Sequence, residues 1–165
     1  MPILYQDDAL VVVDKPSGLV VHRGWGQDRV VAMTLVREAL GRHVFPVHRL
    51  DRGTSGALVF ALSPEIARLL QQRFEAGLVE KRYLALVRGV PPETGVIDHP
   101  IPREPDGPRV PAVTEFHRLA TFERYALLEV VPKTGRLHQI RRHLKHLSHP
   151  LIGDVRYGKG EHNRL

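Results

Sequence analysis

The segment HRLDRGTSG, residues 48–56, contains a carboxylate whose surroundings could do chemistry. Asp51 lies between Arg49 and Arg52, and the small residues that follow favour a tight turn. A cationic neighbour lowers the pKa of a carboxylate and fixes its orientation. An ionised, desolvated carboxylate can attack an electrophilic sugar carbon or take a proton from it. The alternative is structural, because a turn aspartate can also bind the backbone of the residues that follow it.

A second segment, which begins at Thr134 or Gly135 and ends before Pro150, predicts a helix with two different stripes. Its apolar residues share one side at helical spacing, and they are Leu137, Ile140, Leu144 and Leu147. Its cations flank that side, and they are His138, Arg141, Arg142 and Lys145. Arg141 lies at the border of the two stripes, where a side chain can reach into a cleft. The other cations, with Arg136, either contact phosphate or form a solvated surface.

The charge of the whole chain points to a polyanionic partner. The net charge is +6, and 19 of the 24 basic residues are arginine, whose planar fork matches phosphate geometry. The region 133–165 holds eight Lys or Arg and five His against two acids. There is no cysteine, which excludes disulfides and thiolate metal sites. No apolar run approaches membrane-spanning length and the N-terminus is not a signal peptide, so we expect a cytoplasmic protein without membrane contact.

Several other chemistries lack their usual residues. His143, His146 and His149 are three apart, but no carboxylate or thiolate accompanies them at ligand spacing, so we expect no metal. Asp14 and Asp154 are interpreted as turn residues. The chain has no nucleophile elbow, no glycosidase-like carboxylate pair, no glycine-rich phosphate loop and no dinucleotide fingerprint. If it is an enzyme, it therefore uses one carboxylate and no cofactor.

The elements that must position these residues predict an α+β architecture. Helices are expected at 33–40, closed by Gly41, and from the N-cap Ser63 to Gly77. Strands are expected at 3–6, 9–14, 56–62, 81–89, 112–122 and 125–131, with 56–62 in the centre of a sheet. The segment 98–111 contains five prolines and is expected to form a long exposed loop.

Four segments, in order, resemble pseudouridine synthases of the RluA type. ILYQDDALVVVDKPSGLVVH is similar to the start of their catalytic domain, and HRLDRGTSG to the motif with the catalytic aspartate. KRYLALVRG is similar to their second motif, with its tyrosine at Tyr83, and TGRLHQIRRHLKHLSHPLIGDVRYG to their third, with its arginine at Arg141. The resemblance covers most of the chain.

This resemblance implies a fold, a reaction and site residues. The fold would be the α+β pseudouridine synthase fold, a mixed, mainly antiparallel sheet with flanking helices and a central RNA-binding cleft. Asp51 would be the catalytic residue. Tyr83 would stack on a flipped uracil, Arg141 would pair with Asp51, and Arg49 would fill the gap left by the flipped base. Arg136, Arg142 and Lys145 would bind the RNA backbone. No cofactor or metal is implied.

Segments such as LVVHRGW and the ending HNRL most resemble the family members that modify tRNA at uridine sixty-five, on the T-stem side of the acceptor arm. Three alternatives remain open: a ribosomal-RNA synthase of the same family, an RNA-binding module without catalysis, and, for Tyr83 and His48, packing roles only. We expect one catalytic domain over residues 1–165 and a monomer. No S4-type module precedes the first motif, and the chain ends earlier than is usual in the family.

Overall fold

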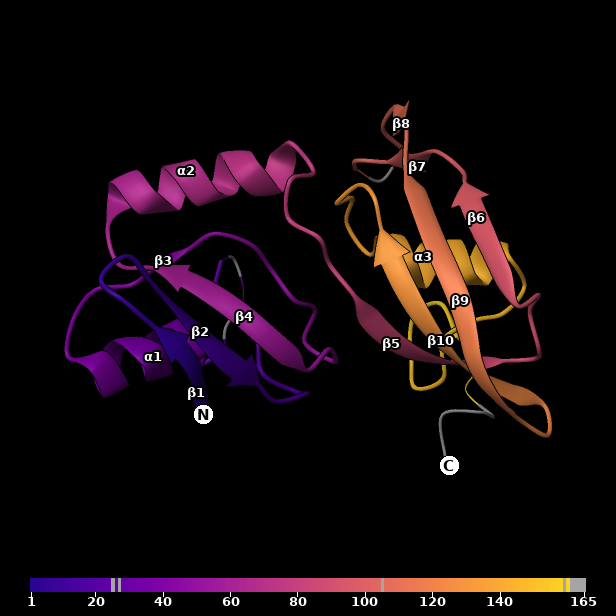
Figure 1. Cartoon of the computed structure of the whole chain (residues 1–165), viewed down its shortest axis with the longest axis horizontal. Coiled ribbons are helices and arrows are strands. Elements are labelled where there is room, and N and C mark those ends of the chain that lie inside the picture. Colours follow the sequence, from indigo (N-terminus) through magenta and orange to yellow (C-terminus); the bar gives the residue numbers. More distant parts are fainter. Residues whose placement is uncertain (25, 27, 105, 159, 161–165) are drawn as a thin grey trace. The chain divides into compact units, whose positions relative to one another are not determined.

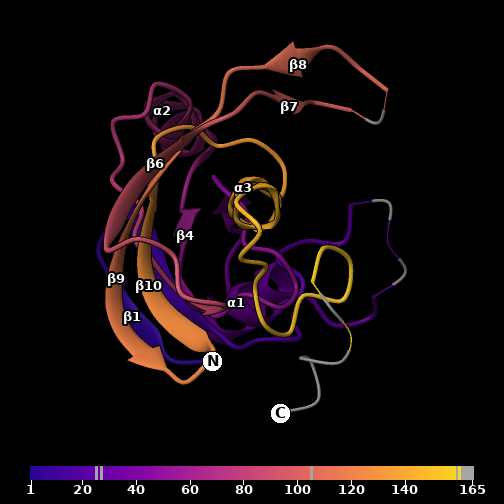
Figure 2. The same cartoon turned by 90° about the vertical axis from the view of Figure 1, so that its right-hand side faces the viewer.

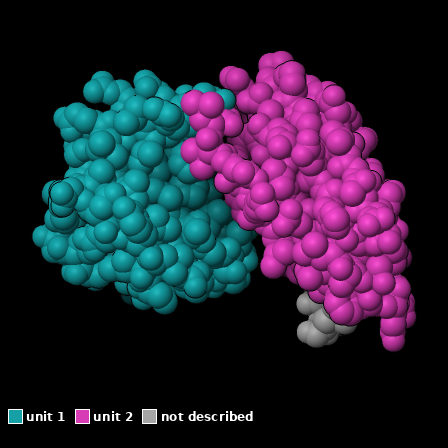
Figure 3. Space-filling view, in the orientation of Figure 1, with its two compact units in different colours: residues 1–76 teal, residues 77–165 magenta. Residues whose placement is uncertain are grey.

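The computed structural model describes residues 1–24, 26, 28–104, 106–158 and 160. Trp25 and the ending HNRL, on which part of the resemblance rests, lie outside the described residues. The chain forms two compact units, Met1–Ala76 and Gly77–Leu165 (Figures 1 and 3). Each unit has its own sheet and its own hydrophobic core. In the described part of the chain, no helix combines the length and the apolar character needed to cross a membrane.

The first unit is built on a four-stranded antiparallel sheet with the order β1-β2-β4-β3. Its strands are β1 (Ile3–Gln6), β2 (Leu10–Lys15), β3 (Phe45–Pro46) and β4 (Gly56–Ala61). Alternate residues of the two inner strands are buried, namely Val11, Val13, Leu58 and Phe60. This period-2 burial explains why the uncharged run at 56–62 forms an inner strand, as predicted.

Two helices complete this unit, and their ends follow the sequence signals. Helix α1 (Ala32–Leu40) is closed by Gly41, whose φ of 64° is left-handed and suits a residue without Cβ. Helix α2 (Pro64–Glu75) starts after Ser63, whose Oγ accepts a hydrogen bond from the Ile66 N–H. Both predicted helices are confirmed.

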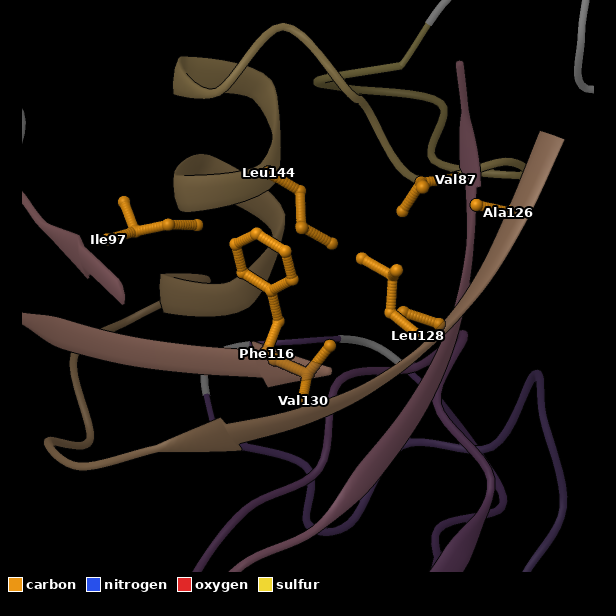
Figure 4. Close-up of a cluster of buried hydrophobic side chains, with 8 residues drawn as sticks. Val87, Ile97, Phe116, Ala126, Leu128, Val130 and Leu144 are labelled. Carbon is orange, nitrogen blue, oxygen red and sulfur yellow. The ribbon is translucent and has the colours of Figure 1, made fainter. Parts of the chain in front are cut away.

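The second unit contains a four-stranded antiparallel sheet with the order β5-β10-β9-β6 and one covering helix. The strands are β5 (Tyr83–Arg88), β6 (Thr94–Asp98), β9 (Val113–Phe122) and β10 (Tyr125–Pro132). Helix α3 (Gln139–His146) lies on the concave face of this sheet (Figure 2). Its Leu144 is fully buried and points toward Phe116 and Leu128 (Figure 4). This core fixes the helix that carries most of the predicted basic residues.

The structure differs from the sequence prediction in three places. The predicted loop at 98–111 contains a short hairpin, β7 (Ile101–Pro102) and β8 (Arg109–Val110). The strands form two four-stranded sheets with antiparallel pairing throughout, rather than one mixed sheet. Helix α3 begins at Gln139 instead of residue 134 or 135, because His138 has a left-handed φ of 52° that a helix cannot continue through. The α+β class itself is confirmed.

One close approach in the second sheet gives a test of its packing. Gly95 of β6 lies opposite Phe116 of β9, and an added Cβ would overlap the Phe116 ring. We expect Gly95→Ala to lower the free energy of unfolding by about 1–3 kcal/mol, because the ring must shift within a packed core. Chemical denaturation followed by circular dichroism measures this. The penalty should shrink in a Phe116→Leu background, and an equal penalty in both backgrounds would contradict the explanation.

Candidate active site

The loop that carries Asp51 is held by the core on one side and by a turn on the other. Leu50 is buried, Asp51 is half-buried, and Arg49 is exposed. The N–H of Thr54 donates to the backbone oxygen of Asp51 at 3.0 Å, which closes the turn before β4 begins at Gly56. The chain therefore presents Asp51 at the start of an inner strand, as the spacing predicted.

A buried ammonium group lies beneath this loop. Lys15, at the end of β2, is fully buried, and its Nζ donates to the backbone oxygens of Pro16 (2.9 Å), Leu19 (2.6 Å) and Arg52 (3.2 Å). The acceptor on Arg52 belongs to the residue directly after Asp51. An ammonium has three protons, so these three bonds satisfy it without a carboxylate contact. Lys15 thus joins the turn after β2 to the Asp51 loop.

The charge of Lys15 also acts on Asp51. Burial lowers the pKa of Lys15, the attraction of the Asp51 carboxylate opposes this by raising it, and the nearby Arg52 lowers it again. The net pKa lies below its ordinary value. A second bond between the same two turns, from Ser17 Oγ to the Gly53 oxygen at 2.8 Å, limits their movement. The loop that carries Asp51 is therefore hydrogen-bonded to the turn after β2, next to the buried charge of Lys15.

His48 packs against helix α2, in line with the packing role that the sequence indicated. Its ring stacks on Phe74 of α2 with centroids 4.5 Å apart and an angle of 11° between the planes. Its Nε2 accepts the Val59 N–H at 3.0 Å. Arg52 pairs with Asp28 through two hydrogen bonds of 2.8 and 3.1 Å. Both neighbours thus help to fix the loop around Asp51.

In the second unit, a buried chain of polar groups anchors the start of α3. Thr134 Oγ1 donates to Gln139 Oε1 (2.6 Å), and Gln139 Nε2 donates to Thr114 Oγ1 (3.0 Å). Thr114 Oγ1 lies 2.7 Å from His143 Nδ1, and His143 Nε2 lies 2.8 Å from the His99 oxygen. Because a carbonyl oxygen only accepts, Nε2 carries the proton and Nδ1 accepts the Thr114 hydroxyl. This arrangement fits a neutral His143 ring, the form that burial favours by lowering the pKa of this residue.

Arg141 of α3 is bound by a carboxylate from the segment that follows the helix. Its Nε donates to Asp154 Oδ2 at 2.8 Å, and its Nη2 donates to Asp154 Oδ1 at 3.0 Å. The Asp154 side chain is 1% exposed and that of Arg141 is 20% exposed. The backbone N–H groups of Arg156 and Tyr157 also donate to Asp154 Oδ1, both at 3.0 Å. Asp154 is thus a turn residue, as predicted, and also the anchor of Arg141.

These bonds decide the protonation of Asp154. Burial raises the pKa of this carboxyl group, but the bonds from Arg141 and from the N–H groups of Tyr157 and Arg156 lower it by more. The net pKa lies below its ordinary value of 3.8, so Asp154 is ionised near neutral pH. The pair is therefore an ion pair with ideal fork geometry, which holds the Arg141 guanidinium in one orientation.

Tyr83 is the first residue of β5 and lies half-buried against the core of the second unit. It faces the same side of the sheet as Ala85 and Val87, which is the side that α3 covers. This is the packed position that the structural interpretation predicted. A half-buried ring also leaves surface on which a base can stack.

The remaining predicted residues lie on α3 or next to it. Arg136 Nε donates to the Pro111 oxygen at 2.9 Å, and Arg142 Nη1 donates to the Pro102 oxygen at 3.2 Å. Lys145 is exposed. The structure thus brings Arg136, Arg142 and Lys145 together around one helix, while Asp51 and Arg49 belong to the other unit. The predicted pairing of Asp51 with Arg141 stays a prediction.

Comparison with known proteins shows which family the chain belongs to. The family model described as RNA pseudouridylate synthase matches residues 9–146. The chain belongs to the RNA pseudouridylate synthase family. Family membership confirms the resemblance found in the sequence. The matched residues include both Asp51 and Arg141.

Curated relatives in this family are similar over nearly the whole chain. The chain is 46% identical to the tRNA pseudouridine synthase C of Pectobacterium carotovorum subsp. carotovorum, over 99% of its own length and 50% of that protein. It is 44% identical to the tRNA pseudouridine synthase C of Haemophilus ducreyi, over 99% of its length and 76% of that protein. The chain thus spans about half of the first relative and about three quarters of the second.

Two solved structures of the family are also similar. Human RNA Pseudouridylate Synthase Domain Containing 4 shares 32% identity at a TM-score of 0.81, over 98% of this chain and 70% of that chain. Human RNA Pseudouridylate Synthase Domain Containing 1 shares 26% identity at a TM-score of 0.82, over 99% of this chain and 72% of that chain. These likenesses confirm the pseudouridine synthase fold.

The roles of three residues that support the candidate site were not found from the sequence. Lys15 continues the buried alternation of Val11 and Val13, so its position in the pattern could have indicated a buried charge. Asp154 is preceded by a glycine and followed by cations, but nothing in its spacing selects Arg141, 13 residues away, as its partner. Gln139 lies among charged residues, and only the fold shows that it is buried.

The Asp154 ion pair yields a prediction for stability. We expect Asp154→Asn to lower the free energy of unfolding by on the order of 2–4 kcal/mol at pH 7, because it removes the charged partner that binds the largely buried Arg141 through two hydrogen bonds. The pKa of Asp154 is lowered by folding, so the wild-type stabilisation is present above pH 3.8 and lost as the pH falls through the folded pKa. The difference in the free energy of unfolding between the wild type and Asp154→Asn should therefore narrow below about pH 4, as measured by denaturation experiments.

A matched control is Glu115→Gln, which removes a carboxylate whose pair with Lys133 is about half exposed. We expect a change below about 1 kcal/mol for it. Equal effects of the two substitutions, or a difference at Asp154 that persists unchanged to pH 2, would contradict the proposed ion pair.

His143 yields a prediction in a different pH range. Its pKa is lowered by burial and by the nearby His99 and His146 rings, against the opposite influence of the His99 carbonyl and the Asp98 carboxylate. Its stabilisation is therefore present above the ordinary pKa of 6.5 and lost as the pH falls below it. We expect the wild type to lose more stability between pH 7 and 5 than His143→Gln does, measured by urea denaturation. Parallel pH profiles would refute this.

Proposed function

We propose that this chain converts uridine to pseudouridine in tRNA and that Asp51 is its catalytic residue. The observation that carries the proposal is the setting of Asp51, a half-buried carboxylate held by a closed turn above the buried ammonium of Lys15. Membership of the pseudouridylate synthase family supports the reaction, and the names of the tRNA pseudouridine synthase C relatives support tRNA as substrate.

The reaction is an isomerisation, so it needs neither an external oxidant nor a second substrate. The bond between uracil N1 and the sugar carbon C1′ breaks, the base turns, and C5 of the base bonds to the same sugar carbon while its proton moves to N1. Asp51 would either attack the sugar carbon or take a proton from the sugar, and it is regenerated at the end. In either role the Asp51 carboxylate acts beside the buried Lys15, with whose charge it interacts.

The other site residues would handle the substrate. The target base must leave the helical stack to be reached, and Tyr83 would stack on the flipped uracil and assist proton transfer. Arg49 is exposed beside Asp51 and would fill the gap in the RNA. Arg141 would pair with Asp51, with Asp154 fixing the orientation of its guanidinium. Arg136, Arg142 and Lys145 would contact RNA phosphates.

The finer features of the function belong to the same proposal. The target would be uridine sixty-five, on the T-stem side of the acceptor arm. The protein would act as a monomer in the cytoplasm. A ribosomal-RNA substrate and a chain that binds RNA without catalysis are the alternatives that an experiment must separate.

The test of catalysis is tritium release from tRNA labelled at uracil C5. We expect release with the wild-type chain and a loss on the order of a thousandfold or more with Asp51→Asn, which keeps the shape but removes the charge. Glu65→Gln is a matched control in the same unit, because it removes an exposed carboxylate in the first turn of α2, outside the Asp51 loop, and it should retain activity. Robust turnover by Asp51→Asn would refute the catalytic role.

The alternatives give different outcomes in the same assay. Binding of tRNA without tritium release by the wild-type chain would favour an RNA-binding module. Release from ribosomal RNA but not from tRNA would favour the ribosomal-RNA alternative. Mapping pseudouridine in total RNA with and without the gene would then identify the target uridine, and a site outside the acceptor arm would overturn that part of the proposal.

A further inference from the structure

Tyr157 is surrounded by positive charge. The segment after α3 folds back beside the helix (Figure 2), and places the Tyr157 ring among four cations. Their distances from the ring centroid are 5.1 Å for Arg141, 5.8 Å for Arg142, 6.0 Å for Lys145 and 5.3 Å for Arg156. Aromatic rings attract cations through their electron-rich faces, so the ring partly offsets the mutual repulsion of these charges.

The hydroxyl group of Tyr157 adds directional bonds. Arg142 Nε donates to Tyr157 Oη at 3.1 Å, and His138 Nδ1 lies 3.1 Å from the same oxygen. Because Arg142 can only donate a hydrogen bond, the Tyr157 hydroxyl is free to donate its own hydrogen bond to His138 Nδ1. The ring and the hydroxyl therefore both help to fix the side chains around them.

Most of this charge is not neutralised by the protein. Among the residues that the structure describes, Asp154 is the carboxylate in this cluster, and it is used by Arg141. No ion pair with a described carboxylate is formed by Arg142, Lys145 or Arg156. Lys145 and Arg156 are exposed and Arg142 is half-buried, so the uncompensated charges can be reached from solution. A group of three cations that repel one another favours an anionic ligand.

We propose that Tyr157 organises Arg142, Lys145 and Arg156 into one binding surface for RNA phosphate groups. This inference rests on the proposed function, which supplies RNA as the polyanion. It adds Arg156 as a phosphate-binding residue and Tyr157 as a positioning residue that contributes no charge of its own. Phosphate contacts carry no sequence information, so the contribution of this surface should not depend on RNA sequence.

The role of Arg156 is tested by RNA binding of the full chain across a salt series. We expect Arg156→Gln to weaken tRNA binding by about three- to tenfold at low salt and to reduce the slope of log K against log salt by about 0.7–0.9. The loss should be the same with an unrelated RNA of equal length. Arg124→Gln, in the turn between β9 and β10, makes the same charge change and should leave the slope unaltered.

The role of Tyr157 is tested by a change that leaves net charge constant. We expect Tyr157→Leu to weaken RNA binding by about three- to tenfold, and Arg156→Gln to cost less in the Tyr157→Leu background than in the wild type, because the ring no longer holds the arginine. Tyr157→Phe, which keeps the ring and removes the hydroxyl, should have an effect between wild type and Tyr157→Leu. Thermal unfolding of each variant shows whether the chain is folded. If Tyr157→Leu is not folded, Tyr157→Phe combined with Arg142→Gln carries the test, because the hydroxyl accepts a hydrogen bond from Arg142.

The outcomes separate this inference from the proposed function. Failure of the wild-type chain to bind RNA would overturn the proposed function. RNA binding by the wild type with Arg156→Gln indistinguishable from Arg124→Gln would overturn the phosphate surface alone. Additive effects of Arg156→Gln and Tyr157→Leu, or of Arg142→Gln and Tyr157→Phe, would overturn the positioning role of the tyrosine.

Discussion

The second unit depends on one buried carboxylate. Moving Asp154 out of water is costly, and two guanidinium nitrogens and two backbone N–H groups that bind its oxygens offset this cost. The same oxygens therefore fix a helix side chain, Arg141, and the turn that contains Arg156 and Tyr157. If the turn moved, a charge would be left buried without a partner. These bonds tie the turn that carries Arg156 and Tyr157 to Arg141 of α3.

The first unit uses the opposite charge for a similar purpose. Lys15 is buried with its ammonium bound to three backbone oxygens, so its position is set by the loops it joins and not by a carboxylate contact. Its charge remains available to act on Asp51 over a longer range. In each unit, a buried ion satisfied by local bonds thus holds a group proposed for function. This arrangement preorganises both groups before RNA binds.

Periodicity and end signals were enough to predict most of the elements. The Ser63 cap, the Gly41 stop and the alternation along β10 act locally, so the sequence alone reveals them. The start of α3 could not be predicted in this way, because the Gln139 side chain binds Thr134 and the N–H of Arg136 and so replaces the first helical turn. The pairing of Asp154 with Arg141 also depends on a chain reversal that no local pattern encodes. Motif resemblance, rather than residue chemistry, selected Tyr83.

Neighbouring arginines on α3 show why residue type alone does not assign a role. Arg141 and Arg142 are adjacent, but consecutive helical residues point about 100° apart, so they meet different partners. Arg141 is 20% exposed and bound to a carboxylate, which neutralises it and fixes its direction. Arg142 binds a phenol and a carbonyl oxygen, which hold its geometry but leave its charge uncompensated. A neutralised, oriented arginine suits the positioning of a reacting group, whereas an oriented arginine with net charge suits phosphate. One helix can therefore serve both the chemistry and the binding of RNA.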